Sequence, residues 1–187
     1  MQSNSGEFQD RCNRLFQVRG LYDEIRNNKN GQFTDPFNFS REYTAAANVF
    51  LGQFKVQAAY QAIRTSGAAS AAGASPTSLD HEWGGVTWQA TPAAALIAAV
   101  YHVNANKGGG NATIYTIGGS YNLSKRTLLD LQVATVRNSK TANFGLDANG
   151  AGNGGNITAS DGTVSYNENP LHGKSQTGVY AGIQHSF

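Results

Sequence analysis

The sequence is poor in charge, cysteine and proline, and it has no long apolar run. Only 14% of its 187 residues are charged, and the formal net charge is +2, whereas an average soluble domain is roughly 25% charged. A nucleic-acid binder that works by neutralising phosphates is therefore not expected. The longest apolar stretch, Ala93 to Tyr101, is far shorter than the roughly 20 residues that a membrane-spanning helix needs. Transmembrane β-strands stay possible, because they need only about 9–11 residues of alternating character.

The chain also lacks the motifs of common enzymes and metal sites. Its single cysteine, Cys12, has no partner for an internal disulfide bond. His81-Glu82 is not followed by a second histidine at the zinc-protease spacing, and neither a P-loop nor a Gly-x-Ser-x-Gly elbow occurs. We therefore expect no enzyme activity and no catalytic, metal-binding or cofactor-binding residues. The N-terminus has no basic region followed by an apolar core, so no signal peptide is predicted within this chain.

The dominant pattern that is present has a period of two. Over Phe54–Gln61 and Leu129–Ala134, apolar and polar residues alternate, which predicts strands with one apolar and one polar face. The same alternation recurs over Ile114–Tyr121 and over a terminal strand at 175–187. Less regular strands are predicted over Phe39–Leu51, His81–Ala90, Ala94–Asn104 and, weakly, Leu15–Arg26.

Short and long connections between these strands alternate along the chain. The short ones are Leu51–Gln53, Thr91–Ala93 and Asn122–Arg126. The long ones are rich in small and polar residues and cover 27–36, 65–79, 105–110 and 138–174. Outer-membrane barrels have this arrangement, because their turns are short on one side of the membrane and their loops are long on the other. The Gly-rich stretch 138–174 is too polar to bury a core and is predicted to be a long loop.

The C-terminal third resembles a known family. The turn from Tyr121 to Thr127, Tyr-Asn-Leu-Ser-Lys-Arg-Thr, followed by an alternating strand, resembles the last periplasmic turn of the general diffusion porins of Gram-negative bacteria, of the beta-proteobacterial type. The closing run Ser175–Phe187 is similar to the final strand of that family, and Phe50–Tyr60 and Trp88–Pro92 resemble its hairpins. The resemblance covers 35–187 and leaves 1–34 as a poorly assigned N-terminal segment with one weak strand.

The resemblance implies an all-β fold, an antiparallel meander that forms a transmembrane β-barrel. Family barrels have roughly sixteen strands around an aqueous lumen, so this chain, with about seven to eight, is expected to be the C-terminal half of a porin barrel. The implied function is a passive diffusion channel for ions and small hydrophilic solutes across the bacterial outer membrane, inactive as this fragment alone. The implied partners are the lipid bilayer, the barrel-assembly machinery and, in the full-length family, a homotrimer.

Strand parity assigns side chains to the two faces of this wall. A cation that faces lipid at mid-depth costs about 2–4 kcal/mol. The polar residues of each alternating strand should therefore face the lumen. The pore-lining candidates are Lys55, Gln57, Gln61, Asp130, Gln132, Tyr180 and Gln184. For the two charged candidates, Lys55 and Asp130, a position at the barrel rim is the open alternative.

Two further groups of residues are predicted. Aromatic residues near strand ends predict a girdle at the membrane interfaces: Tyr43, Tyr60, Trp88, Tyr101 and Tyr121. In the porin family, a terminal Phe preceded by alternating residues is the signal read by the assembly machinery. The resemblance therefore implies an assembly signal made of Val179, Ala181, Ile183, His185 and Phe187.

Two other interpretations remain open at this point. A secreted or surface all-β binding module, such as a jelly roll, would use 138–174 as a recognition loop and would need two packed sheets with aromatics in the core. An outer-membrane enzyme on a barrel scaffold would need a Ser/His/acid set, but His81, His102 and His172 have no evident partner by spacing. Apolar rows packed inside a compact globule would exclude the porin interpretation.

Overall fold

The fold consists of β-strands and their connections. The computed structural model describes residues 15–34, 36, 39–66, 76–146 and 172–187, and the backbone of two short strands within 156–166. Cys12 and much of the 138–174 connection lie outside the described residues. The long strands are β1 (Phe16–Glu24), β2 (Arg41–Leu51), β3 (Phe54–Arg64), β4 (Ser78–Gln89), β5 (Ala94–Ala105), β6 (Gly110–Ser124), β7 (Thr127–Asn138) and β10 (Gln176–His185).

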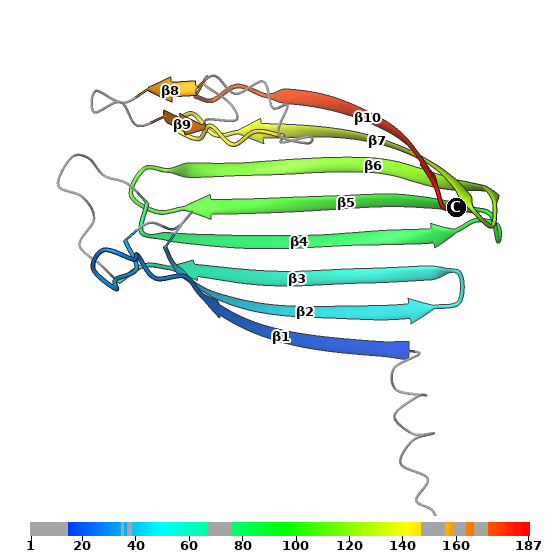
Figure 1. The fold of residues 1–187 in the computed structure, drawn as a ribbon, viewed down its shortest axis with the longest axis horizontal. Helices are drawn as coiled ribbons and strands as arrows, with labels where there is room; N and C mark the ends of the chain where they lie inside the picture. The colour runs from blue at the N-terminus through cyan, green and yellow to red at the C-terminus, as the bar shows by residue number, and fades with distance from the viewer. Residues whose placement is uncertain are drawn as a thin grey trace, which may run out of the picture.

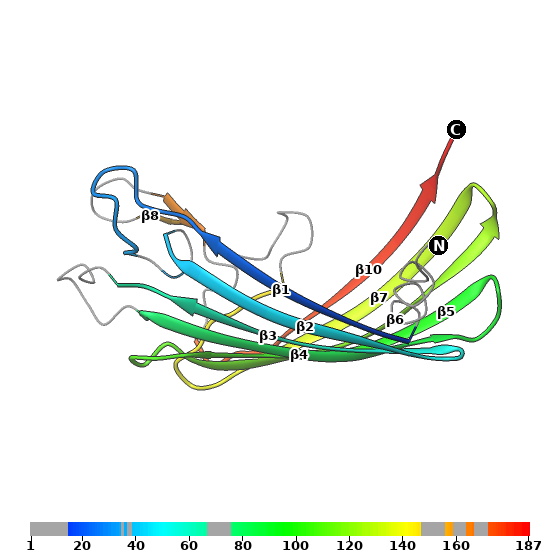
Figure 2. The ribbon, with the colours of Figure 1, turned by 90° about the horizontal axis from the view of Figure 1, so that it is seen from below.

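The eight long strands form one antiparallel sheet in chain order, β1-β2-β3-β4-β5-β6-β7-β10. Short turns lie at one end of the strands and long connections at the other (Figure 1). The sheet curves into a trough with β1 and β10 at its two rims, and it does not close on itself (Figure 2). The predicted all-β antiparallel meander is therefore confirmed, as an open sheet. No helix in the described part of the chain is long and apolar enough to span a bilayer.

The strand predictions differ from the structure mainly in extent. The weak strand predicted over Leu15–Arg26 is β1, and all nine of its residues pair with β2. The predicted connection 122–126 is shorter, because β6 continues to Ser124 and β7 begins at Thr127. The register shift between Asn122 and Ser124 accommodates this tight turn. The predicted loop 138–174 contains a small hairpin of β8 (Asn156–Thr158) and β9 (Val164–Tyr166).

Exposure alternates along much of β3, with the apolar residues on the more open face. In β3, Phe54, Val56 and Tyr60 are exposed, whereas Lys55 and Gln57 are half-buried. Side chains converge on the concave face of a curved sheet and spread apart on its convex face, so the apolar row belongs to the convex face. Ile117 and Val179, in register with the same row, are 64% and 71% exposed.

This arrangement is the reverse of a water-soluble sandwich. In the described part of the chain, the long strands form a single layer, and no second sheet covers their apolar rows. A jelly roll requires two sheets packed around an apolar core. The structure therefore does not support the binding-module interpretation, and the large apolar residues of the convex face are left for a hydrocarbon environment.

A small core lies on the concave side at the long-connection end. Leu79 and Val136, both of concave-face parity, are 3% and 0% exposed. The chain after β7 covers this region, because the Asn138 side chain donates to the Phe144 carbonyl at 2.8 Å and accepts from the Phe144 amide at 2.9 Å. The amide of Leu146 donates to the Gln176 side chain at 2.8 Å. The first part of this connection thus folds inward over the concave face.

Candidate functional site

The candidate site is the polar surface of the concave face. On β1–β3, the register aligns Gln17, Asn48 and Gln57 in one row across the sheet. The Gln57 amide donates to Asn48 Oδ1 at 2.9 Å, and the Asn48 amide donates to Gln17 Oε1 at 3.3 Å. Neighbouring strands are about 4.8 Å apart, so amide side chains of this length can bridge them. The row is a polar surface whose groups satisfy one another.

Two more polar pairs continue this surface. Gln61, four residues further along β3 from Gln57, donates to Glu42 Oε2 at 2.8 Å. On the other half of the sheet, Gln132 donates to the Thr116 hydroxyl at 2.8 Å across β6 and β7. Polar side chains therefore line the described concave face on both of its sides, on β1–β3 and on β6–β7.

Few charged residues lie on the concave face, and they include both acidic and basic ones. Lys55 is the second residue of β3, close to the tight turn in which Gly52 has a φ of 60°. Asp130 lies opposite Gly182, where a Cβ would come within 2.8 Å of the carboxylate, so this glycine leaves room for it. On the described strands, three carboxylates (Asp23, Glu42 and Asp130) share this face with two permanent cations (Arg19 and Lys55). The face is therefore close to neutral.

The register places all seven pore-lining candidates on this concave face. Lys55, Gln57 and Gln61 follow one another on β3, and Asp130 and Gln132 do so on β7. Tyr180 and Gln184 are on the edge strand β10, opposite Gln132 and Leu128. The candidates thus form two groups, one on either side of β4–β6. Their contact with lumen water remains a prediction.

Four of the five predicted girdle residues lie on the convex face. Tyr43 contacts Tyr22 of β1, with ring centroids 5.1 Å apart, and Trp88 stacks on Phe54 at 6.1 Å. Tyr60 and Tyr121 have the same parity in the register. Large aromatic side chains at the borders of an apolar band are typical of membrane interfaces.

Tyr101 lies on the other face and does not belong with these four. It is opposite Trp83, which in turn pairs with Ala59 on the concave side. The His81 ring is 5.0 Å from Trp83 and 6.4 Å from Tyr101, so these three rings form an aromatic patch on the concave face. Sequence reasoning did not assign His81 or Trp83 to this face, although the parity of Trp88, followed back along β4, would have placed both there.

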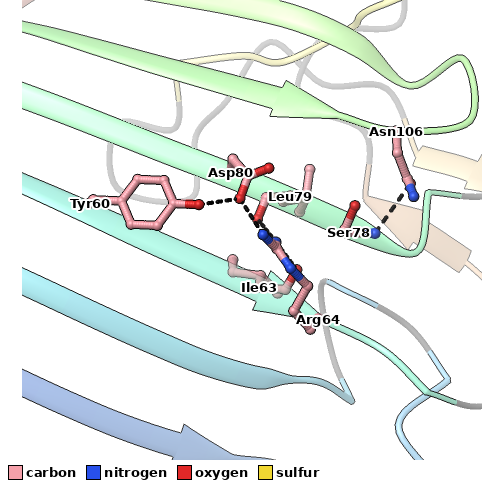
Figure 3. A network of polar contacts seen from close by, with 7 residues as sticks. All are labelled: Tyr60, Ile63, Arg64, Ser78, Leu79, Asp80 and Asn106. Atoms are coloured by element: carbon pink, nitrogen blue, oxygen red, sulfur yellow. Dashed lines mark hydrogen bonds and ion pairs between the residues drawn. The ribbon is translucent and has the colours of Figure 1, made fainter.

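A polar network marks the end of the apolar band on the convex side (Figure 3). The Tyr60 hydroxyl donates to Asp80 Oδ1 at 2.6 Å, and Arg64 forms an ion pair with the same carboxylate at 2.5 Å. Arg64 also donates to the carbonyls of Ile63 and Leu79, each at 2.9 Å. The tyrosine thus has its ring in the apolar band and its hydroxyl among charges. Sequence reasoning did not single out Arg64 or Asp80.

These features together describe a curved wall that is apolar outside and polar inside. The family model of the Gram-negative porins matches residues 4–141. This chain belongs to the Gram-negative porin family. The match begins well before residue 35, where the sequence resemblance started, so it includes β1. No protein of the curated collection matches the chain significantly.

Membership of this family, which is a family of channels rather than of enzymes, locates the chain in the bacterial outer membrane and gives it the general function of a porin. In the described part of the chain, no group of three or more His, Cys, Asp or Glu side chains is placed to hold a metal ion. The convex row of β10 contains Val179, Ala181, Ile183 and His185, and Phe187 follows the strand fully exposed. Recognition of this row by the assembly machinery remains a prediction.

Proposed function

We propose that the concave face lines the lumen of a passive diffusion channel for ions and small hydrophilic solutes. The observation that supports this proposal is the distribution of side chains over the two faces of the sheet. Exposed apolar rows lie on the convex face, and hydrogen-bonded amides lie on the concave one. Eight strands are about half the wall of a barrel with an aqueous lumen. The chain therefore supplies part of a pore rather than a complete one.

The composition of the concave face favours weak discrimination between solutes. Its amides are engaged with neighbouring polar side chains, as in the pairs of Gln57 with Asn48 and Gln61 with Glu42, and so present few free groups to a passing solute. Conduction requires binding weak enough for the solute to leave. With three carboxylates against two cations on the described strands, the wall has little net field to exclude ions of either sign.

Cysteine labelling tests the assignment of the two faces. In a Cys12→Ser background, Gln57→Cys should react rapidly with a charged, water-soluble thiol reagent when the chain is in the outer membrane, and Val56→Cys should react at least about tenfold more slowly, because a thiolate is disfavoured in hydrocarbon. The pair Gln132→Cys and Val133→Cys repeats the comparison on β7. Equal labelling rates within both pairs would contradict the proposal that the concave face lines the lumen.

The position of Lys55 is tested by charge reversal. In a conducting pore that contains this chain, Lys55→Glu should shift the reversal potential in a salt gradient toward cation preference, because a fixed charge in a narrow lumen biases the local ion concentration. Lys125→Glu, in the turn between β6 and β7, makes the same change in net charge outside the strands. An unchanged potential for Lys55→Glu would place this residue at the rim, which is the alternative that its closeness to the turn supports.

We further propose that the convex row of β10 is read by the barrel-assembly machinery and that complete pores form homotrimers. Both proposals rest on the family, and the exposure of Val179 and Ile183 is compatible with them. We also propose that the isolated chain is inactive, because the two open edges of its sheet leave backbone groups unpaired.

A further inference from the structure

A cluster of three aromatic rings lies near the centre of the concave face. Trp83 is the sixth of the twelve residues of β4, so it is halfway along the strand. Tyr101 is directly opposite Trp83 in the register, and the His81 ring lies 5.0 Å from Trp83 and 6.4 Å from Tyr101, between ring centroids. Aromatic residues of a girdle lie at the membrane interfaces. Rings at mid-depth on the lumen side therefore need a different explanation.

Packing into the core does not account for these rings. The core residues Leu79 and Val136 are buried, whereas the three rings are only half-buried. Ala59 is opposite Trp83 on β3, and Gly85 is the next residue of β4 on the same face. Little side-chain bulk therefore borders the Trp83 ring toward β3 and toward the short-turn end of the sheet, which leaves space there for a solute.

The polar atoms of the three rings have no partner within the part of the chain that the structure describes. There, no hydrogen bond engages Trp83 Nε1, either ring nitrogen of His81 or the Tyr101 hydroxyl, and none of these atoms is buried. Gln61, opposite His81, donates its amide N–H to a carboxylate, which leaves its carbonyl oxygen as an acceptor. Hydrogen-bond donors and acceptors are therefore available around an aromatic surface.

The centre of the concave face is also uncharged. On the described strands β4–β6, no residue of this face is Asp, Glu, Lys or Arg. The acidic and basic residues of the face lie on β1–β3 and β7, on either side of these strands. An ion that stops at the rings would find no opposite charge on the same strands to pair with. A neutral solute with many hydroxyl groups fits these surroundings better.

Sugars in the pyranose form match these features. One face of a pyranose ring presents C–H groups that pack on an aromatic face, and the hydroxyls around its edge both donate and accept hydrogen bonds. Small-molecule sites combine such apolar surfaces with a few polar groups. We propose that Trp83, His81 and Tyr101 form a weak binding site for one pyranose unit of a neutral sugar. This site rests on the proposed function, because a solute meets it only if the concave face lines the channel.

The test uses the full chain folded in micelles of a deuterated amine-oxide detergent, which contains no sugar. Saturation-transfer difference NMR detects magnetisation that passes from the protein to a bound small molecule. The probes are methyl glucoside, whose ring is closed, and sorbitol, which offers similar hydroxyls on an open chain. The glucoside should give a saturable signal, strongest at its C–H protons, and sorbitol should bind at least about tenfold more weakly because it has no ring face to stack.

Substitutions of the two tryptophans separate the site from the rest of the wall. Trp83→Ala removes the stacking ring and should weaken glucoside binding about tenfold or more. Trp88→Ala is the matched control, because it removes the same ring from the convex face, and it should leave binding unchanged. Tyr101→Phe keeps the ring and loses only the hydroxyl, so it should weaken binding about threefold. Since the sequence has two tryptophans, emission from the remaining one shows whether each alanine variant folds.

Three results would overturn the proposal. They are equal affinities for the glucoside and sorbitol, unchanged glucoside binding by Trp83→Ala, and tighter binding of phenol than of the glucoside, which would identify a site for aromatic solutes instead. None of these measurements depends on conduction. A failure of the glucoside to bind would therefore leave the proposed channel standing, whereas equal cysteine labelling of the two faces would contradict both the channel and the sugar site.

Discussion

The isolated chain is expected to give no stepwise current in planar bilayers. Strands β1 and β10 each have only one neighbour, so nine and ten residues respectively border an open edge of the described sheet. In hydrocarbon, each unsatisfied N–H or C=O group costs several kcal/mol, which is why membrane sheets are closed. Two open edges together outweigh what the apolar rows gain, so a conducting state of the single sheet should not be populated.

The measurement is a bilayer recording with the purified chain on one side, in parallel with a complete porin of the same family as a positive control. The complete porin should give regular steps, and the isolated chain only baseline noise. Steady steps of uniform size from the isolated chain would contradict this prediction, because they would show that its edges become paired. Closure as a narrow eight-stranded barrel would still give no current, since side chains fill so small an interior.

Leu131→Arg is expected to destabilise the folded chain by about 2–4 kcal/mol in hydrocarbon, the range found for arginine at the middle of the bilayer. Leu131 is on the convex face, opposite Gly119 and Ala181, and is 54% exposed in the middle of the apolar band. Detergent chains must cover this position in a micelle. A urea titration of the micelle-bound chain, followed by tryptophan emission, measures the loss.

Gln132→Arg is the control, because it puts the same side chain on the adjacent residue of the concave face. It removes one hydrogen bond, from Gln132 to Thr116, and should therefore cost only about 1 kcal/mol. The difference between the two variants in the free energy of unfolding measures how differently the two faces tolerate a charge. Equal losses, or a larger loss at residue 132, would mean that the faces are assigned the wrong way round.

The part of the fold that was predictable from sequence is the part where polarity alternates cleanly. In β3 and β7, each polar residue is flanked by apolar ones, and the faces of Gln57 and Gln132 follow at once. Tyr101 was misplaced because Ala93–Tyr101 is apolar on both faces, which leaves the phase of β5 undetermined. Only the register, which pairs Tyr101 with Trp83, decides it.

The clusters at the strand ends could not be predicted in the same way. Arg41 and Arg64 are opposite each other because the β2–β3 turn is tight, a relation that the sequence contains. The contacts of Arg41 with the Phe33 ring and of Arg64 with Asp80 depend on how the long connections settle, and no periodicity describes that. The same is true of Asn138 and the segment that it holds over the concave face.

The even number of long strands constrains whatever completes the wall. Because β1 and β10 are the first and eighth members of an antiparallel meander, they run in opposite directions. An added sheet that is to meet both of them with antiparallel seams must itself have an even number of strands. An odd number would force one parallel seam into the ring, and a parallel neighbour cannot be reached through a short hairpin.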